Sequence, residues 1–253
     1  MKVLIVGGGG REHAIVWKIA QSPKVDKIYC APGNGGIAEL AECVDIAATD
    51  IENMVKFAKD NAIDLVMVAP DDPLVLGMVD AMEKEGIRAF GPRANAAIIE
   101  GSKAFSKELM KKYNIPTANY EVFTDSTSAI DYIKAQNTFP TVIKADGLAL
   151  GKGVIIAQNL EEAEQAVHEM IDDGKFGKSG SRVVIEEFLT GPEVSVLAFT
   201  DGKTVKPMVS AQDHKRAYDN DEGLNTGGMG TFSPSRLYDD AKAEECMKNI
   251  FVP

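Results

Sequence analysis

Residues Lys144 to Val154 read KADGLALGKGV, which places two lysines and three glycines between two short apolar runs. The flanks, 141–144 and 154–157, are β-branched and apolar, as strands of a packed sheet are. Glycines permit positive φ and let backbone N–H groups approach a ligand closely. The stretch predicts a β-hairpin that could close over a polyphosphate, and a hairpin with merely solvated lysines fits it equally well. No Gly-Lys-Ser/Thr precedes a helix, so it is not a Walker A loop.

Upstream of this stretch, residues 1 to about 92 alternate short apolar runs with helical segments. Such alternation predicts βαβ units in a parallel sheet, whose buried strands read as continuous apolar runs. The predicted strands are 3–6, 27–30, 65–69 and 88–90, and the predicted helices are 11–21, 51–60 and 74–85. We therefore expect an α/β protein whose first domain, 1–102, is Rossmann-like.

The remaining residues, 103–253, change to a different order of elements. A helix over 94–113 leads into this part and ends before Pro116, because proline stops a helix. The predicted strands are one that begins at residue 120, then 141–144, 154–157, 183–188, 193–200 and 204–212, and the predicted helices are 126–136 and 160–172. Turns such as Asp201-Gly202 join the last strands, so this part is expected to be an antiparallel α+β domain.

The composition limits the partners and the compartment. The formal net charge of −11 argues against a nucleic acid or an anionic membrane, because both attract proteins with broad positive potential. Three scattered cysteines form no disulfide framework and no Cys-x-x-Cys zinc motif, which fits a reducing cytoplasm. The sequence shows neither a signal peptide nor a membrane-length apolar run.

The run Gly7-Gly8-Gly9-Gly10-Arg11-Glu12-His13 follows the first strand and opens a helix, where free N–H groups favour an anion. The second strand ends without the acid that binds the ribose of a dinucleotide, so we expect a phosphate pocket for a smaller ligand than NAD. The alternative is a tight turn needed for packing. Residues 32–36 and 69–74 should lie at the same sheet edge, although Asp71 alone reads as a helix N-cap.

Carboxylates cluster near the end of the strand at 183–188. Glu193 could accept hydrogen bonds from two ribose hydroxyls of a nucleotide, whereas a solvated edge charge is the commoner role of one acid. Glu186 alternates with Val184 and Phe188, so it should be buried and have a polar partner. The polar, glycine-rich residues 212–230 predict a long functional loop, in which His214 has no nucleophilic Ser or Cys pattern beside it.

Taken together, these motifs resemble the glycinamide ribonucleotide synthetase family of the ATP-grasp superfamily, whose first part this chain would represent. The resemblance spans nearly the whole chain and rests on GGGGREHA, APGNGG, the Pro73-Leu74-Val75 segment, residues 109–120 with IPTA, KADGLALGKGV, VIEEFL, AQDHKR and NTGGMG. It implies an ATP-dependent ligase of purine biosynthesis that joins glycine to 5-phosphoribosylamine through glycyl phosphate. ATP and Mg²⁺ (or Mn²⁺) are the implied cofactors, and the full-length protein is expected to be a monomer.

The resemblance also assigns residues by matching positions. The ATP-binding residues are Lys103, Lys144, Gly147, Gly151, Lys152, Gly153, Glu186, Glu187, Phe188, Leu189 and Glu193. The residues for the phosphoribosylamine are Gly8, Gly9, Gly10, Arg11, Glu12, His13, Asn34, Pro73 and Leu74. The residues near the reacting groups are Asp213, Arg216, Asn225, Thr226, Gly227 and Gly228. Residues of about 120–190 would form a lid, and its hairpin, 147–153, is expected to be mobile without nucleotide.

Three departures from the family pattern qualify this reading. Leu224 replaces a usual proline and Pro192 replaces a common glutamate. The metal-binding Glu and Asn of the family would lie beyond residue 253, so we expect no metal site in this chain. Without that metal site, we expect the chain alone not to convert glycine and ATP. The strands that would cover residues 194–198 are also absent, so we expect apolar surface to be exposed there. The rival hypotheses are a non-catalytic nucleotide-binding module and, less favoured, an NAD-dependent oxidoreductase.

Overall fold

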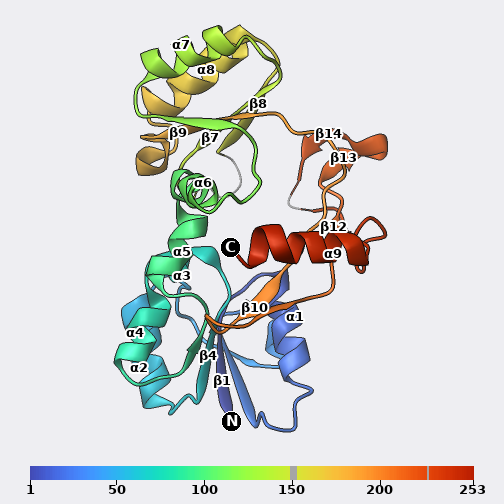
Figure 1. The fold of residues 1–253 in the computed structure, drawn as a ribbon. Helices are drawn as coiled ribbons and strands as arrows, with labels where there is room; N and C mark the ends of the chain where they lie inside the picture. The colour runs from blue at the N-terminus through green and yellow to red at the C-terminus, as the bar shows by residue number, and fades with distance from the viewer. Residues whose placement is uncertain (149–152, 227) are drawn as a thin grey trace. The chain divides into compact units, whose positions relative to one another are not determined.

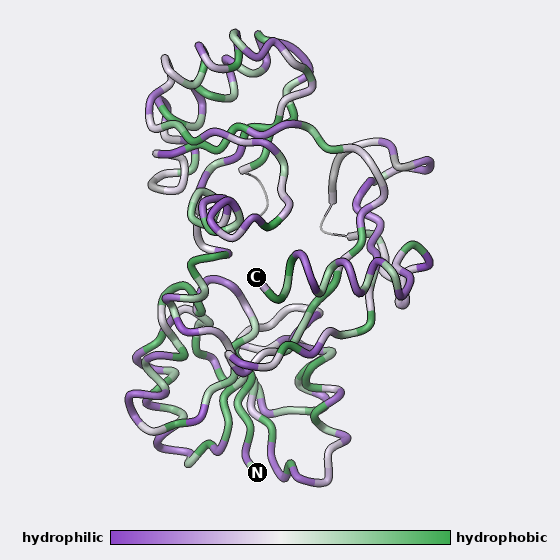
Figure 2. The backbone as a smooth tube through the Cα atoms, in the orientation of Figure 1, coloured by the Kyte–Doolittle hydropathy of each residue, from purple (hydrophilic) through white to green (hydrophobic). Residues whose placement is uncertain are grey.

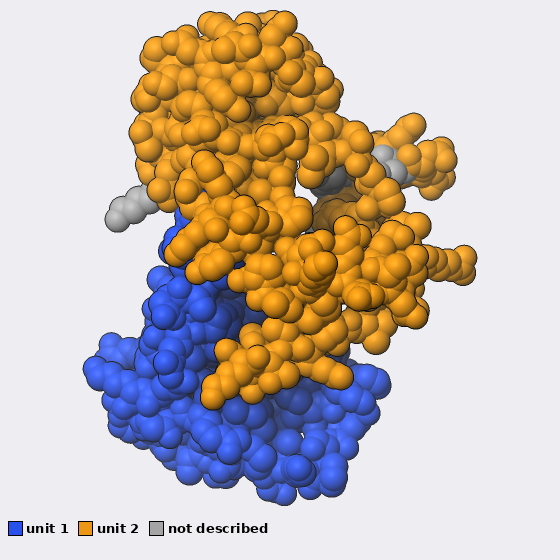
Figure 3. All heavy atoms as spheres, viewed as in Figure 1, with its two compact units in different colours: residues 1–105 blue, residues 106–253 orange. Residues whose placement is uncertain are grey.

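The structure, a computed structural model, describes residues 1–148, 153–226 and 228–253. The chain divides into two compact units, Met1–Phe105 (unit 1) and Ser106–Pro253 (unit 2) (Figure 3). These are units of packing, and the domain boundary at residue 102 and the lid at about 120–190 stay predictions.

Unit 1 is built on a parallel sheet of five strands in the order β3-β2-β1-β4-β5 (Figure 1). The strands are β1 (Lys2–Gly7), β2 (Lys27–Pro32), β3 (Glu42–Cys43), β4 (Leu65–Val68) and β5 (Ala89–Phe90). The order reverses beside β1, as in Rossmann-like sheets, and the predicted fold of this part is confirmed. Gly7 pairs with Pro32, and Val6 pairs with Val68, so the loops after β1, β2 and β4 leave the same sheet edge.

Except for α2 (Ile51–Asp60), which has the predicted bounds, the helices of unit 1 are shorter than the sequence pattern indicates. They are α1 (Gly10–Ile19), α3 (Asp71–Val75), α4 (Met78–Lys84) and α5 (Ala94–Gly101), with the 3₁₀ turn η1 (Ile37–Glu39). Helix α6 (Lys103–Lys112) begins in unit 1, and its residues from Ser106 on belong to unit 2. The helix predicted over 74–85 is interrupted at Gly77, which is left-handed at φ 88°. The helix predicted over 94–113 is interrupted at Ser102, which is extended. Asp71 is the first residue of α3 and Pro70 is its N-cap, so the N-cap role of Asp71 was wrong.

Apolar side chains bury both faces of this sheet. In β1, Leu4 and Val6 belong to one core cluster, and Val3 and Ile5 belong to another. The strands of unit 1 are accordingly among its most hydrophobic segments (Figure 2). A strand buried on both faces has no polar alternation, which explains the continuous apolar run in the sequence.

Cys30 of β2 yields a prediction about thiol reactivity. Its Sγ donates to the carbonyl oxygen of Gly7 at 3.3 Å, and burial, together with the neighbouring Cys43, raises the pKa of Cys30 from 9.0 to about 12. Because the thiolate is the reactive form, iodoacetamide should alkylate Cys30 at least about a hundredfold more slowly than the exposed Cys43. Peptide mass spectrometry of timed samples measures both rates, and equal rates would contradict the burial.

The raised pKa also sets a pH dependence of stability. Below pH 9.0 the Cys30 thiol is protonated in both the folded and the unfolded chain, so its contribution to stability is fully present. As the pH rises toward about 12, the unfolded chain loses this proton first and the contribution is lost. Replacing Cys30 with Ala should therefore flatten the fall of stability at alkaline pH.

Unit 2 begins with a four-stranded antiparallel sheet in the order β6-β9-β7-β8. Its strands are β6 (Tyr120–Phe123), β7 (Thr141–Ala145), β8 (Val154–Ala157) and β9 (Val183–Glu187), and its helices are α7 (Ser126–Gln136) and α8 (Leu160–Ile171). Both helices pack on one face of the sheet (Figure 1). Ile143, Ala145, Val183 and Ile185 point into that core.

The rest of unit 2 consists of short strand pairs and a final helix. The elements are η2 (Gly177–Gly180), β10 (Ala198–Thr200), β11 (Val205–Pro207), β12 (Gln212–Asp213), β13 (Arg216–Tyr218), η3 (Asp219–Asp221), β14 (Glu222–Asn225), β15 (Thr231–Phe232), α9 (Asp240–Cys246) and the π-helical turn η4 (Met247–Phe251). The strands predicted over 193–200 and 204–212 are thus much shorter. The predicted loop 212–230 instead contains the pair β13–β14 and the strand β12, which pairs with β15. Among the described helices, none has the length and apolarity needed to span a membrane.

Candidate nucleotide site

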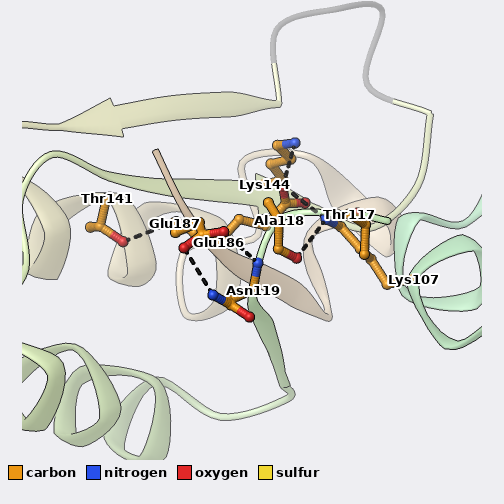
Figure 4. A network of polar contacts seen from close by, with 8 residues as sticks. All are labelled: Lys107, Thr117, Ala118, Asn119, Thr141, Lys144, Glu186 and Glu187. Carbon is orange, nitrogen blue, oxygen red and sulfur yellow. Dashed lines mark hydrogen bonds and ion pairs between the residues drawn. The ribbon is translucent and has the colours of Figure 1, made fainter. Parts of the chain in front are cut away.

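The site in unit 2 is centred on Glu186, near the end of β9. Its side chain is only 6% exposed and lies on the sheet face opposite the helices, because successive residues of a strand alternate between faces. Lys144 Nζ donates to Glu186 Oε2 at 2.9 Å, and Lys107 Nζ lies 3.2 Å from the same oxygen (Figure 4). The prediction that Glu186 is buried and has a polar partner is confirmed.

Strand register brings Lys144 to Glu186. In the pairing of β7 with β9, Val142 is opposite Glu186 and Lys144 is opposite Val184, so the lysine and the glutamate are diagonal neighbours on one face. The side chain of Lys144 remains 27% exposed. Lys144 therefore has a polar partner within the protein and access to a ligand.

Lys107, from α6, completes this cluster and has no counterpart among the predicted site residues. Its side chain is 8% exposed, and its Nζ donates to Thr117 Oγ1 at 2.7 Å and to the carbonyl oxygen of Ala118 at 3.3 Å. The ammonium also lies 5.4 Å from the centre of the Tyr120 ring. Two lysines and one glutamate give the cluster a net positive charge within a chain of net charge −11.

The residues after Glu186 change from buried to exposed. Glu187 accepts from the backbone N–H of Asn119 at 3.0 Å and from its Nδ2 at 2.9 Å, and these hydrogen bonds lower the pKa of Glu187 (Figure 4). Phe188 is 36% and Leu189 64% exposed. Both side chains are therefore accessible to a ligand.

The first residues of the glycine-rich connection, 146–148, form hydrogen bonds with residues 179–182. Arg182 Nε donates to Asp146 Oδ2 at 2.9 Å, and Ser179 Oγ donates to the carbonyl oxygen of Leu148 at 3.1 Å. A Cβ on Gly147 would lie 2.5 Å from Ser179 Oγ, so glycine is required there by a neighbour within the protein. Gly153 lies beside β8, and its carbonyl oxygen accepts from Ala145 N. Gly151 and Lys152 lie outside the described residues, as does most of the hairpin predicted to be mobile.

A second group of predicted residues gathers around Lys215. Its Nζ pairs with Glu193 and lies 4.0 Å from Asp213 Oδ2. Arg216 Nη1 donates to the carbonyl oxygen of Gly223 at 2.6 Å. Thr226 Oγ1 donates to the carbonyl oxygen of Lys215 at 2.8 Å and accepts from Gly228 N at 3.1 Å. Asn225 is the last residue of β14, and Gly227 lies outside the described residues.

In unit 1, the glycine run and Asn34 form one connected loop system. Asn34 Nδ2 donates to the carbonyl oxygen of Gly8 at 2.9 Å, and its Oδ1 accepts from Ile37 N at 2.9 Å. The buried Glu12 carboxylate accepts from Gly9 N, which occupies one N–H group of the predicted anion pocket. The other predicted residues of this unit are Gly10 and Arg11 at the start of α1, His13 beside Gly36, the buried Pro73 and Leu74 of α3, and Lys103 at the start of α6.

Comparison with known families accounts for the whole chain. Residues 1–100 match the family described as phosphoribosylglycinamide synthetase, N domain, and residues 101–253 match phosphoribosylglycinamide synthetase, ATP-grasp (A) domain. The chain belongs to the phosphoribosylglycinamide synthetase family. The resemblance inferred from the motifs is therefore confirmed, and so is the fold class, a Rossmann-like domain followed by part of an ATP-grasp domain.

Individual relatives agree with this membership of the phosphoribosylglycinamide synthetase family. The phosphoribosylamine–glycine ligase of Halalkalibacterium halodurans is 53% identical over all 253 residues, which span 59% of that protein. The crystal structure of the Thermotoga maritima phosphoribosylamine–glycine ligase matches 98% of this chain and 60% of its own with a TM-score of 0.82 and 32% identity. A biotin carboxylase domain from Hydrogenobacter thermophilus, solved with MgADP, shares the fold at 18% identity and a TM-score of 0.77 over 98% of this chain.

Among residues 1–148, 153–226 and 228–253, no three His, Cys, Asp or Glu side chains gather where they could hold a metal ion. The described acids of the site are already engaged with cations or amides. Glu186 binds two lysines, Glu187 binds Asn119 and Glu193 binds Lys215.

Proposed function

We propose that the whole protein is a phosphoribosylamine–glycine ligase of purine biosynthesis. It joins glycine to 5-phosphoribosylamine, with ATP as the energy source, and yields glycinamide ribonucleotide, ADP and phosphate. The observation that carries this proposal is the match of the whole chain to both family domains, together with a 53% identical relative of that name. The chain spans about 59% of the length of that relative, so the proposal concerns the whole protein.

In this reaction the γ-phosphate of ATP passes to the glycine carboxylate, and the amine of phosphoribosylamine then displaces phosphate from the glycyl phosphate. The protein has to hold the reactants in line and neutralise the negative charge of the phosphates. The net positive cluster around Glu186 supports such a role for Lys144, because it creates a local cationic site in an acidic chain. Lys103 and the connection 147–153 would complete the phosphate site.

The adenine base and the ribose of ATP are assigned to residues at the end of β9 and just beyond it. Residues 186–189 would receive the adenine, since they combine a buried carboxylate with exposed apolar side chains. Glu193 would bind the ribose hydroxyls, and it would then exchange its ion pair with Lys215 for hydrogen bonds to the sugar. The ADP of the Hydrogenobacter thermophilus neighbour supports a nucleotide in this fold.

The other substrates are assigned to two further groups of residues. The phosphoribosylamine would bind the residues of unit 1, which are Gly8, Gly9, Gly10, Arg11, Glu12, His13, Asn34, Pro73 and Leu74. The reacting groups would lie near Asp213, Arg216 and residues 225–228. A divalent metal, Mg²⁺ or Mn²⁺, belongs to the proposed reaction, but the described residues do not assemble a site for it, and no step here depends on it. We further propose a cytoplasmic, monomeric protein without nucleic-acid or membrane partners.

Calorimetry with ATP and with NAD tests the nucleotide class of the site. Saturable binding of ATP is expected, with no binding of NAD, because the strand β2 ends without an acid for the ribose of a dinucleotide. Binding of NAD in place of ATP would overturn the proposal. That the 253-residue chain alone does not convert glycine and ATP to product stays a prediction. An assay for glycinamide ribonucleotide with all three substrates and Mg²⁺ decides it.

A further inference from the structure

The cluster at Glu186 contains one more cation than its carboxylate requires. Lys144 and Lys107 both contact Oε2 of Glu186, at 2.9 and 3.2 Å (Figure 4). One ammonium is sufficient to neutralise one carboxylate. The structure therefore raises the question of what the second lysine does.

The two lysines differ in burial and in their partners. Lys107 is 8% exposed, and its ammonium has three acceptors, which are Thr117 Oγ1, the carbonyl oxygen of Ala118 and Glu186 Oε2. An ammonium has three N–H donors, so Lys107 is fully satisfied where it lies. Lys144 is 27% exposed, and its strand leads directly into the glycine-rich connection. Lys107 is thus the fixed partner of Glu186, and Lys144 is the exchangeable one.

We propose that Lys107 is a positioning residue, the permanent counter-ion of Glu186 that allows Lys144 to turn from the carboxylate to a phosphate of the bound nucleotide. This inference rests on the proposed function, since it needs a phosphate ligand at Lys144. When Lys144 moves, Glu186 keeps a cation within its own site. Without Lys107, the same movement leaves a buried carboxylate without a charged partner, which is strongly unfavourable.

A purely structural role of Lys107 has a different consequence. Its hydrogen bonds to residues 117 and 118 tie α6 to the segment that enters β6. If this tie alone mattered, its loss would disturb the whole site, including the part that receives the nucleoside. The proposed role affects only ligands whose phosphates draw Lys144 away from Glu186. ATP and adenosine therefore distinguish the two roles.

The experiment measures the affinities of the whole wild-type protein and of its Lys107→Met variant for ATP and for adenosine by calorimetry. We expect Lys107→Met to bind ATP at least about tenfold more weakly and to bind adenosine within about twofold of the wild type. Lys111→Met is the matched control, since Lys111 is an exposed lysine of the same helix, and it should leave both affinities unchanged.

A second pair of variants tests the dependence on the carboxylate. In Glu186→Gln there is no buried negative charge to neutralise, so adding Lys107→Met should change ATP affinity by less than about threefold. The double variant carries neither buried charge, and its comparison with Glu186→Gln keeps the test valid even if Lys107→Met alone does not fold. Thermal unfolding of each variant establishes that the compared proteins are folded.

The outcomes separate the inference from the proposed function. If the whole wild-type protein does not bind ATP, both are overturned. If the wild type binds ATP and Lys107→Met binds it equally well, only the inference is overturned. An equal loss of ATP and adenosine affinity in Lys107→Met assigns Lys107 a structural role and overturns the inference. The inference is also contradicted if Lys107→Met lowers ATP affinity in the Glu186→Gln background as much as it does in the wild type.

Discussion

Replacing Lys144 with methionine is expected to weaken ATP binding by about 1.5–3 kcal/mol, or roughly ten- to 150-fold, the usual scale for a hydrogen bond to a charged group. Methionine keeps the length of the side chain and removes the charge that would meet a phosphate. The fold should persist, because Lys107 remains 3.2 Å from Glu186 and keeps that buried carboxylate paired. Calorimetry measures the affinity, and thermal unfolding checks the fold.

Lys206→Met is a suitable control for this change. Lys206 lies in β11 of the same unit, it is exposed, and its removal alters the net charge by the same amount. A similar loss of affinity in both variants would indicate a general electrostatic effect of net charge. An unchanged affinity in Lys144→Met would remove this lysine from the nucleotide site.

Gly8→Ala is expected to destabilise unit 1 by about 2–3 kcal/mol, the upper range for an overpacked site, although Gly8 itself is only half-buried. A Cβ on Gly8 would lie 2.5 Å from the carbonyl oxygen of Gly33, and backbone atoms cannot rotate away as a flexible side chain can. The two loops are also tied by hydrogen bonds from Gly33 N to Gly7 O and from Asn34 Nδ2 to Gly8 O. Relieving the clash therefore strains or breaks these bonds.

The same loop offers a matched control for Gly8→Ala. Gly10 is the first residue of α1, and a Cβ added there meets no atom within 4 Å. Gly10→Ala should therefore leave stability unchanged or raise it by up to about 1 kcal/mol, since alanine favours a helix over glycine. Denaturant unfolding followed by the fluorescence of Trp17, the single tryptophan of the chain, reports on unit 1 in both variants. Equal stabilities of the two variants would contradict the close approach of the loops.

Sequence periodicity predicted most of the local structure. Helices α2 and α7 and strand β8 have the predicted bounds, because their caps or glycine neighbours mark the ends. The interruptions at Gly77 and Ser102 could not be predicted in the same way. Both lie inside segments of good helical periodicity, and only packing of the short helices against the sheet and each other shows where the chain must turn. The strand predicted over 193–200 failed because alternation alone does not supply a partner strand.

The candidate site was predicted in part for a similar reason. Alternation along β9 indicated that Glu186 is buried, but the sequence could not name its partners. Lys107 is one of four lysines in α6, KAFSKELMKK, and nothing in that segment distinguishes it from the exposed ones. Its role depends on contacts with residues 117–120 and with Glu186, and the latter contact joins residues far apart in the chain. The assigned site residues themselves remain to be tested with ligands.

The strand order of unit 2 has a consequence for the order of events during synthesis. Strand β9 lies between β6 and β7, although it is the last of the four strands to be made. When β6, β7 and β8 have emerged from the ribosome, the position between β6 and β7 in the sheet is still empty. Strand β6 has no partner strand until β9, which ends at residue 187, has also emerged. The sheet of unit 1, in contrast, has all its strands once residue 90 is free. We therefore expect unit 1 to fold first on the ribosome, with unit 2 completing its sheet only after β9 has been inserted.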